Sequence, residues 1–257
     1  KIDRSIRNVR NLGYFSKVSV QTLRGSTPEQ SVTSVTVREQ STGDFSIGFG
    51  YSSLTQAGVT LGINERNFLG TGRRLNLSLS ASGENTDFTI GLTEPYFMDR
   101  DLTGSVDIFK RKNKSGETTV NETGFSLGLG FAAARDVYHR LRYDLSQSKT
   151  TVSQTTATSS TGEEGKSLLG SSVAYTLSKD TRDSRFDPTE GYFLELSETA
   201  SGFGGDVKFL RSKFSAAYYK SLLFKSVIVG VSGKVGHISG LGDNVTQSKR
   251  FYLGGRA

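Results

Sequence analysis

Two features common in folded proteins are absent from this sequence. It contains no cysteine, so neither a disulfide framework nor a thiolate metal site can form. It also contains no apolar run close to the roughly 20 residues that a transmembrane helix needs. The segment Val227–Val231 is about the longest such run. A membrane-spanning form of this chain would have to be a barrel, because only helices and closed barrels satisfy their backbone hydrogen bonds in lipid.

The sequence also lacks the residue groupings of an enzyme or a nucleic-acid-binding protein. Its net charge is +7, but its basic residues are scattered and form no basic helix or aromatic-interleaved stripe of the kind that would indicate nucleic-acid binding. His139 and His237 lie far apart, without a carboxylate at ligand spacing, whereas metal sites and general bases need convergent groups. Nothing in the sequence places Ser, His and Asp as a triad. We therefore expect no enzymatic activity, no cofactor, no metal and no nucleic-acid partner.

The clearest pattern in the sequence is a strict two-residue alternation. Phe45, Ile47, Phe49 and Tyr51 alternate with Asp, Ser and Gly, and the segment 57–64 repeats the pattern after a short polar link. Such alternation predicts strands with one apolar face out of water. The opposite face is small and polar. It would be solvated in a soluble sandwich, and it would line the wet lumen of an outer-membrane barrel.

The same alternation continues along nearly the whole chain. Further strands are expected within 75–82, 88–93, 102–108, 125–131, 137–145, 169–177, 192–197, 210–218 and 227–235, which gives about eleven strands with no helix between them. Long polar connections, such as 110–122 and 147–166, alternate with tighter connections that carry aromatic residues. Both asymmetries are typical of outer-membrane barrels. Charges on the polar face also argue against a half-buried sandwich: Arg140, Arg142, Arg211 and Lys213.

The first 39 residues have a different pattern. Ile2, Ile6, Val9 and Leu12 form a helical stripe, and two strands are expected at 15–23 and 32–39. One helix and two strands bury too little apolar surface to fold alone. We interpret residues 1–39 as the end of a small α+β domain. Because eleven strands are also an odd number for a bacterial barrel, we expect the chain to be a fragment whose first and last strands cannot pair neatly.

Five motifs in order resemble the family of BamA-type outer-membrane protein assembly factors, which join POTRA domains to a barrel. The resemblance extends over essentially the whole chain. It predicts an all-β transmembrane β-barrel, incomplete, preceded by the end of an α+β POTRA domain: residues 1–39 are the C-terminal part of the POTRA domain, and residues 40–257 are the N-terminal portion of the barrel. The motifs are Thr42–Tyr51, Asn64–Gly72, Thr93–Asp101, Asp180–Phe193 and Arg250–Ala257.

The resemblance implies a function without bond chemistry. Family members fold and insert β-barrel proteins in the bacterial outer membrane, with the N-terminal segment in the periplasm. The implied partners are unfolded outer-membrane clients, accessory lipoproteins and the lipid bilayer. The alternatives are a protein-secretion pore and a passive porin, although residues 2–39 argue against a porin. The family's later Arg-Gly motif is absent here, so none of its role is assigned to Arg256.

Two groups of site residues follow from this reading. The first barrel strand would pair with client strands at the barrel seam, and its glycines would weaken it there. The other reading of the Gly48–Gly50 pair is a strand with small lumen residues; no helix follows, so it is no dinucleotide-binding motif. The client-pairing strand comprises Gly43, Asp44, Phe45, Ser46, Ile47, Gly48, Phe49, Gly50 and Tyr51. A salt-bridged, structural periplasmic turn is expected around Asp180, Arg182, Asp183, Pro188 and Gly191.

Overall fold

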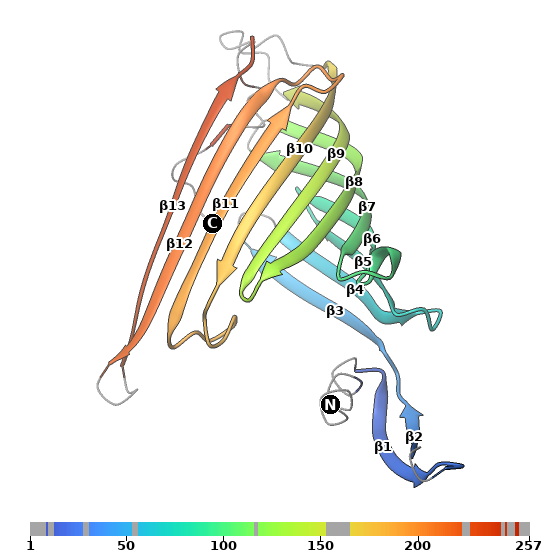
Figure 1. The fold of residues 1–257 in the computed structure, drawn as a ribbon. Helices are drawn as coiled ribbons and strands as arrows, with labels where there is room; N and C mark the ends of the chain where they lie inside the picture. The colour runs from blue at the N-terminus through green and yellow to red at the C-terminus, as the bar shows by residue number, and fades with distance from the viewer. Residues whose placement is uncertain are drawn as a thin grey trace.

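The protein folds into a small two-stranded sheet followed by a large curved one (Figure 1). The computed structural model describes residues 9, 13–27, 31–52, 56–115, 118–152, 165–222, 227–242, 245 and 250–251. In the first sheet, β1 (Phe15–Arg24) pairs antiparallel with β2 (Ser31–Glu39). Both strands match their predicted ranges to within one residue. The helix expected from the apolar stripe lies outside the described residues, except for Val9, which is helical.

The second sheet contains eleven strands in simple sequential order. Each strand pairs antiparallel with the next, which confirms both the all-β architecture and the number of strands expected from the alternation. The strands are β3 (Gly43–Ser52), β4 (Gln56–Phe68), β5 (Arg73–Ser82), β6 (Thr86–Glu94), β7 (Thr103–Ser115), β8 (Thr118–Ala134), β9 (Val137–Val152), β10 (Ser167–Asp180), β11 (Gly191–Ser201), β12 (Phe209–Leu222) and β13 (Val227–Gly240).

The large sheet is not closed within the described residues. Strands β3 and β13 lie at opposite ends of the strand order and are not paired with one another there. Figure 1 shows the sheet curving from β13 round to β3, and β1 and β2 lie below the start of β3 in this view. A 3-10 turn, η1 (Phe97–Asp99), lies between β6 and β7. None of the described helices has the length and apolar character needed to cross a membrane.

The register of the sheet separates an apolar face from a polar one. Directly paired residues form a continuous apolar row across seven strands, from β3 to β9. Several members of this face are exposed, including Phe45 at 68% and Ile108 at 56%. A contiguous exposed apolar surface of this kind indicates contact with another apolar medium or partner. The row consists of Phe45, Ile63, Leu77, Ile90, Ile108, Phe125 and Leu145.

The bounds expected for two of the long connections are wrong, because strands extend into both of them. The segment 110–122 is mostly strand, because β7 continues to Ser115 and β8 begins at Thr118. Likewise, β9 continues to Val152 and so includes the first six residues of the expected 147–166 connection. The paired residues here are polar, as in the Arg111–Glu122 pair, so the hydrophobic alternation stops while the backbone ladder continues. Side-chain polarity marks where the apolar band ends, and backbone hydrogen bonds mark where the strand ends.

Candidate functional site

The predicted client-pairing residues lie together on β3, the strand at one end of the large sheet. Within the described residues, each of them from Gly43 to Tyr51 is paired with a residue of β4 and with no other strand. The Arg66 amide donates to the Thr42 carbonyl, which makes these two residues a hydrogen-bonded pair. Such pairs alternate along an antiparallel ladder. The even-numbered residues of β3 therefore bond to β4, and the N–H and C=O groups of the odd-numbered residues point to the other edge.

The Tyr51 half of β3 borders open space. A cavity of about 480 Å³ lies beside it, between β3, β4 and β5. A Cβ added at Gly50 would meet nothing within 4 Å, and one at Gly48 would first meet Thr60 Cβ at 3.9 Å. Phe49 and Tyr51 are about 80% exposed, at 79% and 81%. This half of the strand therefore has few side-chain contacts to hold it in place.

The Gly43 end of β3 is surrounded by polar contacts. The Thr42 hydroxyl donates to the Glu65 carboxylate, which also accepts from the Asn67 amide at 2.8 Å. Arg66 Nε donates to the Thr42 carbonyl at 3.2 Å, and its guanidinium lies 3.7 Å from Asp44. A Cβ added at Gly43 would lie 2.7 Å from a Glu65 carboxylate oxygen. Thr42, Asp44, Glu65 and Arg66 are therefore connected to one another at this end of the strand.

The predicted turn lies between β10 and β11 and begins with an ion pair. Arg182 Nε is 2.8 Å from Asp180 Oδ1, and both side chains are only 17% exposed. Arg185 reaches the same carboxylate at 3.5 Å. At the other end of the turn, Gly191 has a φ of 102°, and an added Cβ would collide with the Thr181 carbonyl. Only glycine fits such a position without strain.

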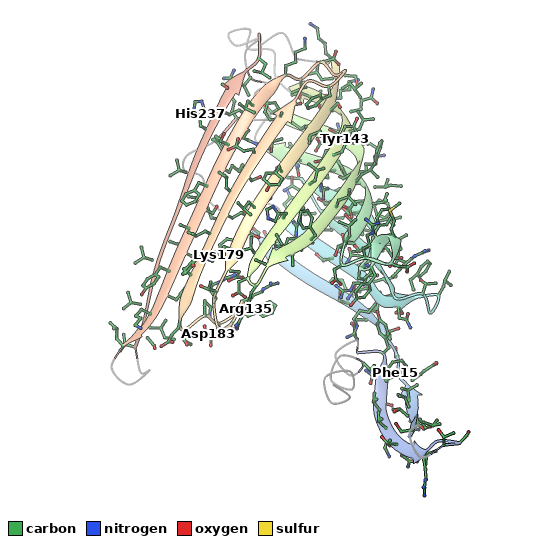
Figure 2. The ribbon with its side chains drawn as sticks, in the orientation of Figure 1. Phe15, Arg135, Tyr143, Lys179, Asp183 and His237 are labelled. Atoms are coloured by element: carbon green, nitrogen blue, oxygen red, sulfur yellow. The ribbon has the colours of Figure 1, made fainter. Side chains whose placement is uncertain are left out.

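Asp183 organises the middle of this turn. Its carboxylate accepts hydrogen bonds from the Thr189 hydroxyl and from the amides of Ser184, Thr189 and Glu190. These bonds, led by the Thr189 hydroxyl, hold the pKa of Asp183 well below its usual range. Pro188 directly precedes Thr189. Figure 2 shows Asp183 and Arg135 near the lower end of the sheet, with His237 near the opposite end.

The concave, polar face carries an ionic network on neighbouring strands. Arg142 of β9 contacts Asp107 of β7 at 3.2 Å, Ser126 of β8 at 2.5 Å and Asp144 at 2.8 Å. Alternation placed Arg142 and its partners on this face, but it did not show which of them meet. The contacts could be found only from the strand register, which aligns Asp107, Ser126 and Asp144 in one row.

Sequence reasoning missed a small apolar cluster on the same polar face. Phe109, Val207 and Phe209 are each 4% exposed and line a cavity of about 280 Å³. The adjacent apolar pairs Ile108-Phe109 and Phe209-Leu210 were the signal, since neighbouring strand residues point to opposite faces. The Arg211 guanidinium lies over the Phe209 ring at 5.4 Å, and its buried Nε has no hydrogen-bond partner among the described residues.

Neither histidine is placed as a metal ligand in the described part of the chain, where no three His, Asp or Glu side chains lie together. His139 instead stacks on Phe131, with ring centroids 5.0 Å apart, and its Nδ1 lies 2.6 Å from the Tyr175 hydroxyl. Phe131 and His139 are directly paired across β8 and β9.

Comparison with known proteins identifies relatives of this sheet. A family model described as the Omp85 superfamily domain matches residues 67–257. The chain is 31% identical to outer membrane protein assembly factor BamA of Nitratidesulfovibrio vulgaris over 99% of its length. It is 27% identical to the BamA of Neorickettsia risticii over 98% of its length. The chain spans about a third of these two relatives, 32% and 35% respectively.

A solved structure has the same fold. The crystal structure of BamA from Haemophilus ducreyi lacking POTRA domains 1-3 aligns with 99% of this chain at a TM-score of 0.85. The alignment covers 52% of that chain, and the two sequences are 18% identical. The arrangement of the eleven strands therefore corresponds to that of part of a known assembly-factor structure.

Proposed function

The chain belongs to the Omp85 superfamily, and on this premise we propose that it is part of a factor that assembles and inserts β-barrel proteins in the bacterial outer membrane. Its two nearly full-coverage relatives named above are both outer membrane protein assembly factors. The function proposed for it involves no bond chemistry. Its substrates would be unfolded outer-membrane proteins, and accessory lipoproteins would be its partners in the assembly complex.

We propose that the large sheet is the N-terminal portion of a transmembrane barrel and that residues 1–39 are the end of a periplasmic POTRA domain. The exposed apolar row across β3–β9 supports contact with lipid, because a solvated sheet face of this size would be unfavourable in water. Strands β3 and β13 would then each need a partner strand, since unsatisfied backbone groups in lipid cost about several kcal/mol each. Further strands of the complete protein would supply those partners.

The observation that carries the proposed function is the position and composition of β3. It is a terminal strand, and three of its residues are glycine. The odd-numbered residues, such as Phe45 and Ile47, direct their backbone groups to the edge away from β4. A client strand could add to that edge by main-chain hydrogen bonds, which do not depend on client sequence and therefore suit many clients. The seam between the first and last strands is where a closed barrel can open without breaking an interior ladder.

The turn between β10 and β11 has a structural role in this proposal. The Asp180–Arg182 ion pair and the Asp183 hydrogen bonds hold the segment in a fixed shape. We assign this turn to the periplasmic side, because it lies at the end of the sheet from which β1 and β2 extend (Figure 2).

Site-specific crosslinking tests the proposed function. Single cysteines at Ser46, Gly48 and Gly50 of the complete protein are exposed to a stalled client that carries a cysteine in its terminal strand. We expect crosslinks in a fixed register at β3. Control cysteines at Ser78 and Ser80, on interior strand β5, should give none, because β5 is already paired on both edges. Equal labelling of β3 and β5 would contradict the proposal.

A further inference from the structure

The two ends of β3 are held very differently. At the Gly43 end, the Glu65 carboxylate accepts from the Thr42 hydroxyl and from the Asn67 amide. Arg66 binds the Thr42 carbonyl twice, through its amide at 3.1 Å and through Nε at 3.2 Å. These contacts connect the start of β3 to the end of β4 through both backbone and side chains. Charge-assisted hydrogen bonds of this kind are the stronger class.

The same region also binds the N-terminal sheet. The Tyr14 hydroxyl donates to the Gly72 carbonyl in the β4–β5 turn at 3.3 Å. In the link between β2 and β3, the Gln40 amide donates to the Tyr14 carbonyl at 3.1 Å, and Gln40 Nε2 donates to the Gly13 carbonyl at 3.0 Å. The turn itself is closed by a hydrogen bond from the Gly72 amide to Asn67 Oδ1 at 2.7 Å. The chain entering β3 is therefore fixed on both sides.

The glycines of β3 follow this asymmetry. At Gly43 the missing Cβ leaves room for the Glu65 carboxylate, which would be 2.7 Å from it. At Gly50 the missing Cβ leaves open space beside the cavity of about 480 Å³. One glycine therefore permits a close contact and the other leaves the strand without one. Local stability follows contact density, so the Tyr51 end should open more readily than the Gly43 end.

We propose that Thr42, Glu65 and Arg66 form a pivot that holds the Gly43 end of β3 against β4. The Tyr51 end of the strand can then move while the Gly43 end stays in place. Glu65 is the positioning residue of this pivot. The inference rests on the proposed function insofar as this movement presents the outer edge of β3 to a client. A client strand would first pair near Tyr51 and extend its ladder towards Gly43. The contacts of Tyr14 and Gln40 transmit the orientation of the N-terminal sheet to the fixed end of β3.

Residue-resolved hydrogen exchange on the complete protein in lipid nanodiscs, without any client, tests the pivot. The relevant amides are those of Asp44, Ser46, Gly48 and Gly50, because the even-numbered residues bond to β4. We expect protection factors at Asp44 and Ser46 to exceed those at Gly48 and Gly50 by about tenfold or more, since each tenfold step corresponds to about 1.4 kcal/mol of local opening free energy.

Variants of the pivot then separate its role from general folding. Glu65→Ala should reduce protection at Asp44 and Ser46 to the level of Gly48, whereas Glu65→Gln should keep most of it, because the amide oxygen still accepts from Thr42 and Asn67. Thr42→Val removes one donor at similar volume and should give a smaller loss. Gly50→Ala, which fills open space, should leave the Gly43 end unchanged. Equal protection at both ends of wild-type β3, or no local effect of Glu65→Ala, would overturn the pivot.

The exchange experiment and the client crosslinking fail independently. A protection gradient without client crosslinks at Gly48 and Gly50 would support the pivot and reject the proposed client-pairing edge. Crosslinks without a gradient would support the edge and reject the pivot.

Discussion

The Arg142 guanidinium of β9 lies 3.2 Å from an Asp107 carboxylate oxygen of β7, across the intervening strand β8. Between them, the Ser126 hydroxyl of β8 is fully buried and accepts a hydrogen bond from Arg142 at 2.5 Å. Asp144, on the same strand as Arg142, provides a second carboxylate at 2.8 Å. One side chain therefore connects three strands on the concave face, in addition to the backbone ladders.

Replacing Arg142 should weaken this part of the sheet. Arg142→Ala leaves Asp107 and Ser126 without their shared partner, and hydrogen bonds to charged groups are worth about 1.5–3 kcal/mol. Because the Arg142 side chain is 36% exposed, we expect the low end, about 1–2 kcal/mol of unfolding free energy. Urea unfolding from liposomes provides the measurement. Arg140→Ala is the control, since the Arg140 guanidinium makes a distant cation–π contact with the Tyr138 ring, 5.8 Å from its centroid. Equal losses for both variants would show that the network contributes nothing specific.

A second prediction concerns which side chains of β5 face lipid, and it depends on the proposed position of the sheet in a membrane. Leu77 belongs to the apolar row, and Ser78, the next residue, lies on the polar face. Leu77→Arg should destabilise folding into liposomes by about 2–4 kcal/mol near the bilayer midplane, while Ser78→Arg should cost less. If Ser78→Arg proved the more harmful change, the apolar face would be the lumen face.

Acid should weaken the turn between β10 and β11 through Asp183. Hydrogen bonds from Thr189 and from the Thr189, Glu190 and Ser184 amides lower the pKa of Asp183 in the folded protein. Its ordinary value is about 3.9. A lowered folded-state pKa means that the stabilisation is fully present above the unfolded value and is lost as the pH falls towards the folded value. We therefore expect full stabilisation at pH 5–7, declining steadily below about pH 4.

The matched variant for this prediction is Asp183→Asn, which keeps one oxygen acceptor but no charge. Exchange rates of the Thr189 and Glu190 amides report the order of the turn. After correction for intrinsic exchange, the protection of these two amides should differ between wild type and Asp183→Asn by a constant amount from about pH 5 to pH 7. In stronger acid this difference in protection should become smaller. A difference that does not change with pH would exclude the Asp183 carboxylate as the source of the stabilisation.

Much of the fold could be predicted from the sequence because side chains alternate with a period of two in strands. Alternation predicted the eleven strands and the apolar face of each one, whereas the row from Phe45 to Leu145 follows only from the register. It did not predict the ends of β7, β8 and β9, where polar pairs such as Arg111–Glu122 continue the ladder without any hydrophobic signal. Strand ends are set there by backbone pairing, to which side-chain polarity gives no guide.

The contacts of the site were harder to predict than its location. The position of β3 at an end of the sheet follows from chain order, but the Glu65–Thr42 and Arg66–Asp44 contacts depend on register and on turn geometry. The same holds for Arg142, whose partners come from two other strands as well as its own. The cluster around Phe209 was missed because apolar residues on a polar face contradict the pattern used to assign that face.

The apolar cluster on the concave face gives the last prediction. Phe209 is 4% exposed and lines the same cavity as Phe109 and Val207. The loop that carries Val207 is bound to β10 through Asp206. The Asp206 carboxylate accepts from the Leu169 amide, and the Asp206 amide donates to the Leu169 carbonyl, each at 2.7 Å. Removing the Phe209 ring would leave a void beneath this loop, because the surrounding strands cannot close over it.

Phe209→Ala should therefore cost about 3–5 kcal/mol of unfolding free energy, the range for buried phenylalanine. The natural control is Phe203→Ala in the same loop, because Phe203 is 60% exposed and should cost less than about 0.5 kcal/mol. Urea unfolding from liposomes compares the two variants, and hydrogen exchange at the Asp206 amide follows the loop. We expect Phe209→Ala alone to accelerate that exchange, since the loop loses the apolar surface beneath Val207 while its hydrogen bonds to Leu169 keep their donors and acceptors. Similar costs for Phe203→Ala and Phe209→Ala would mean that the cluster is not a core, and that the loop is held by its hydrogen bonds, such as those of Asp206 and Ser201.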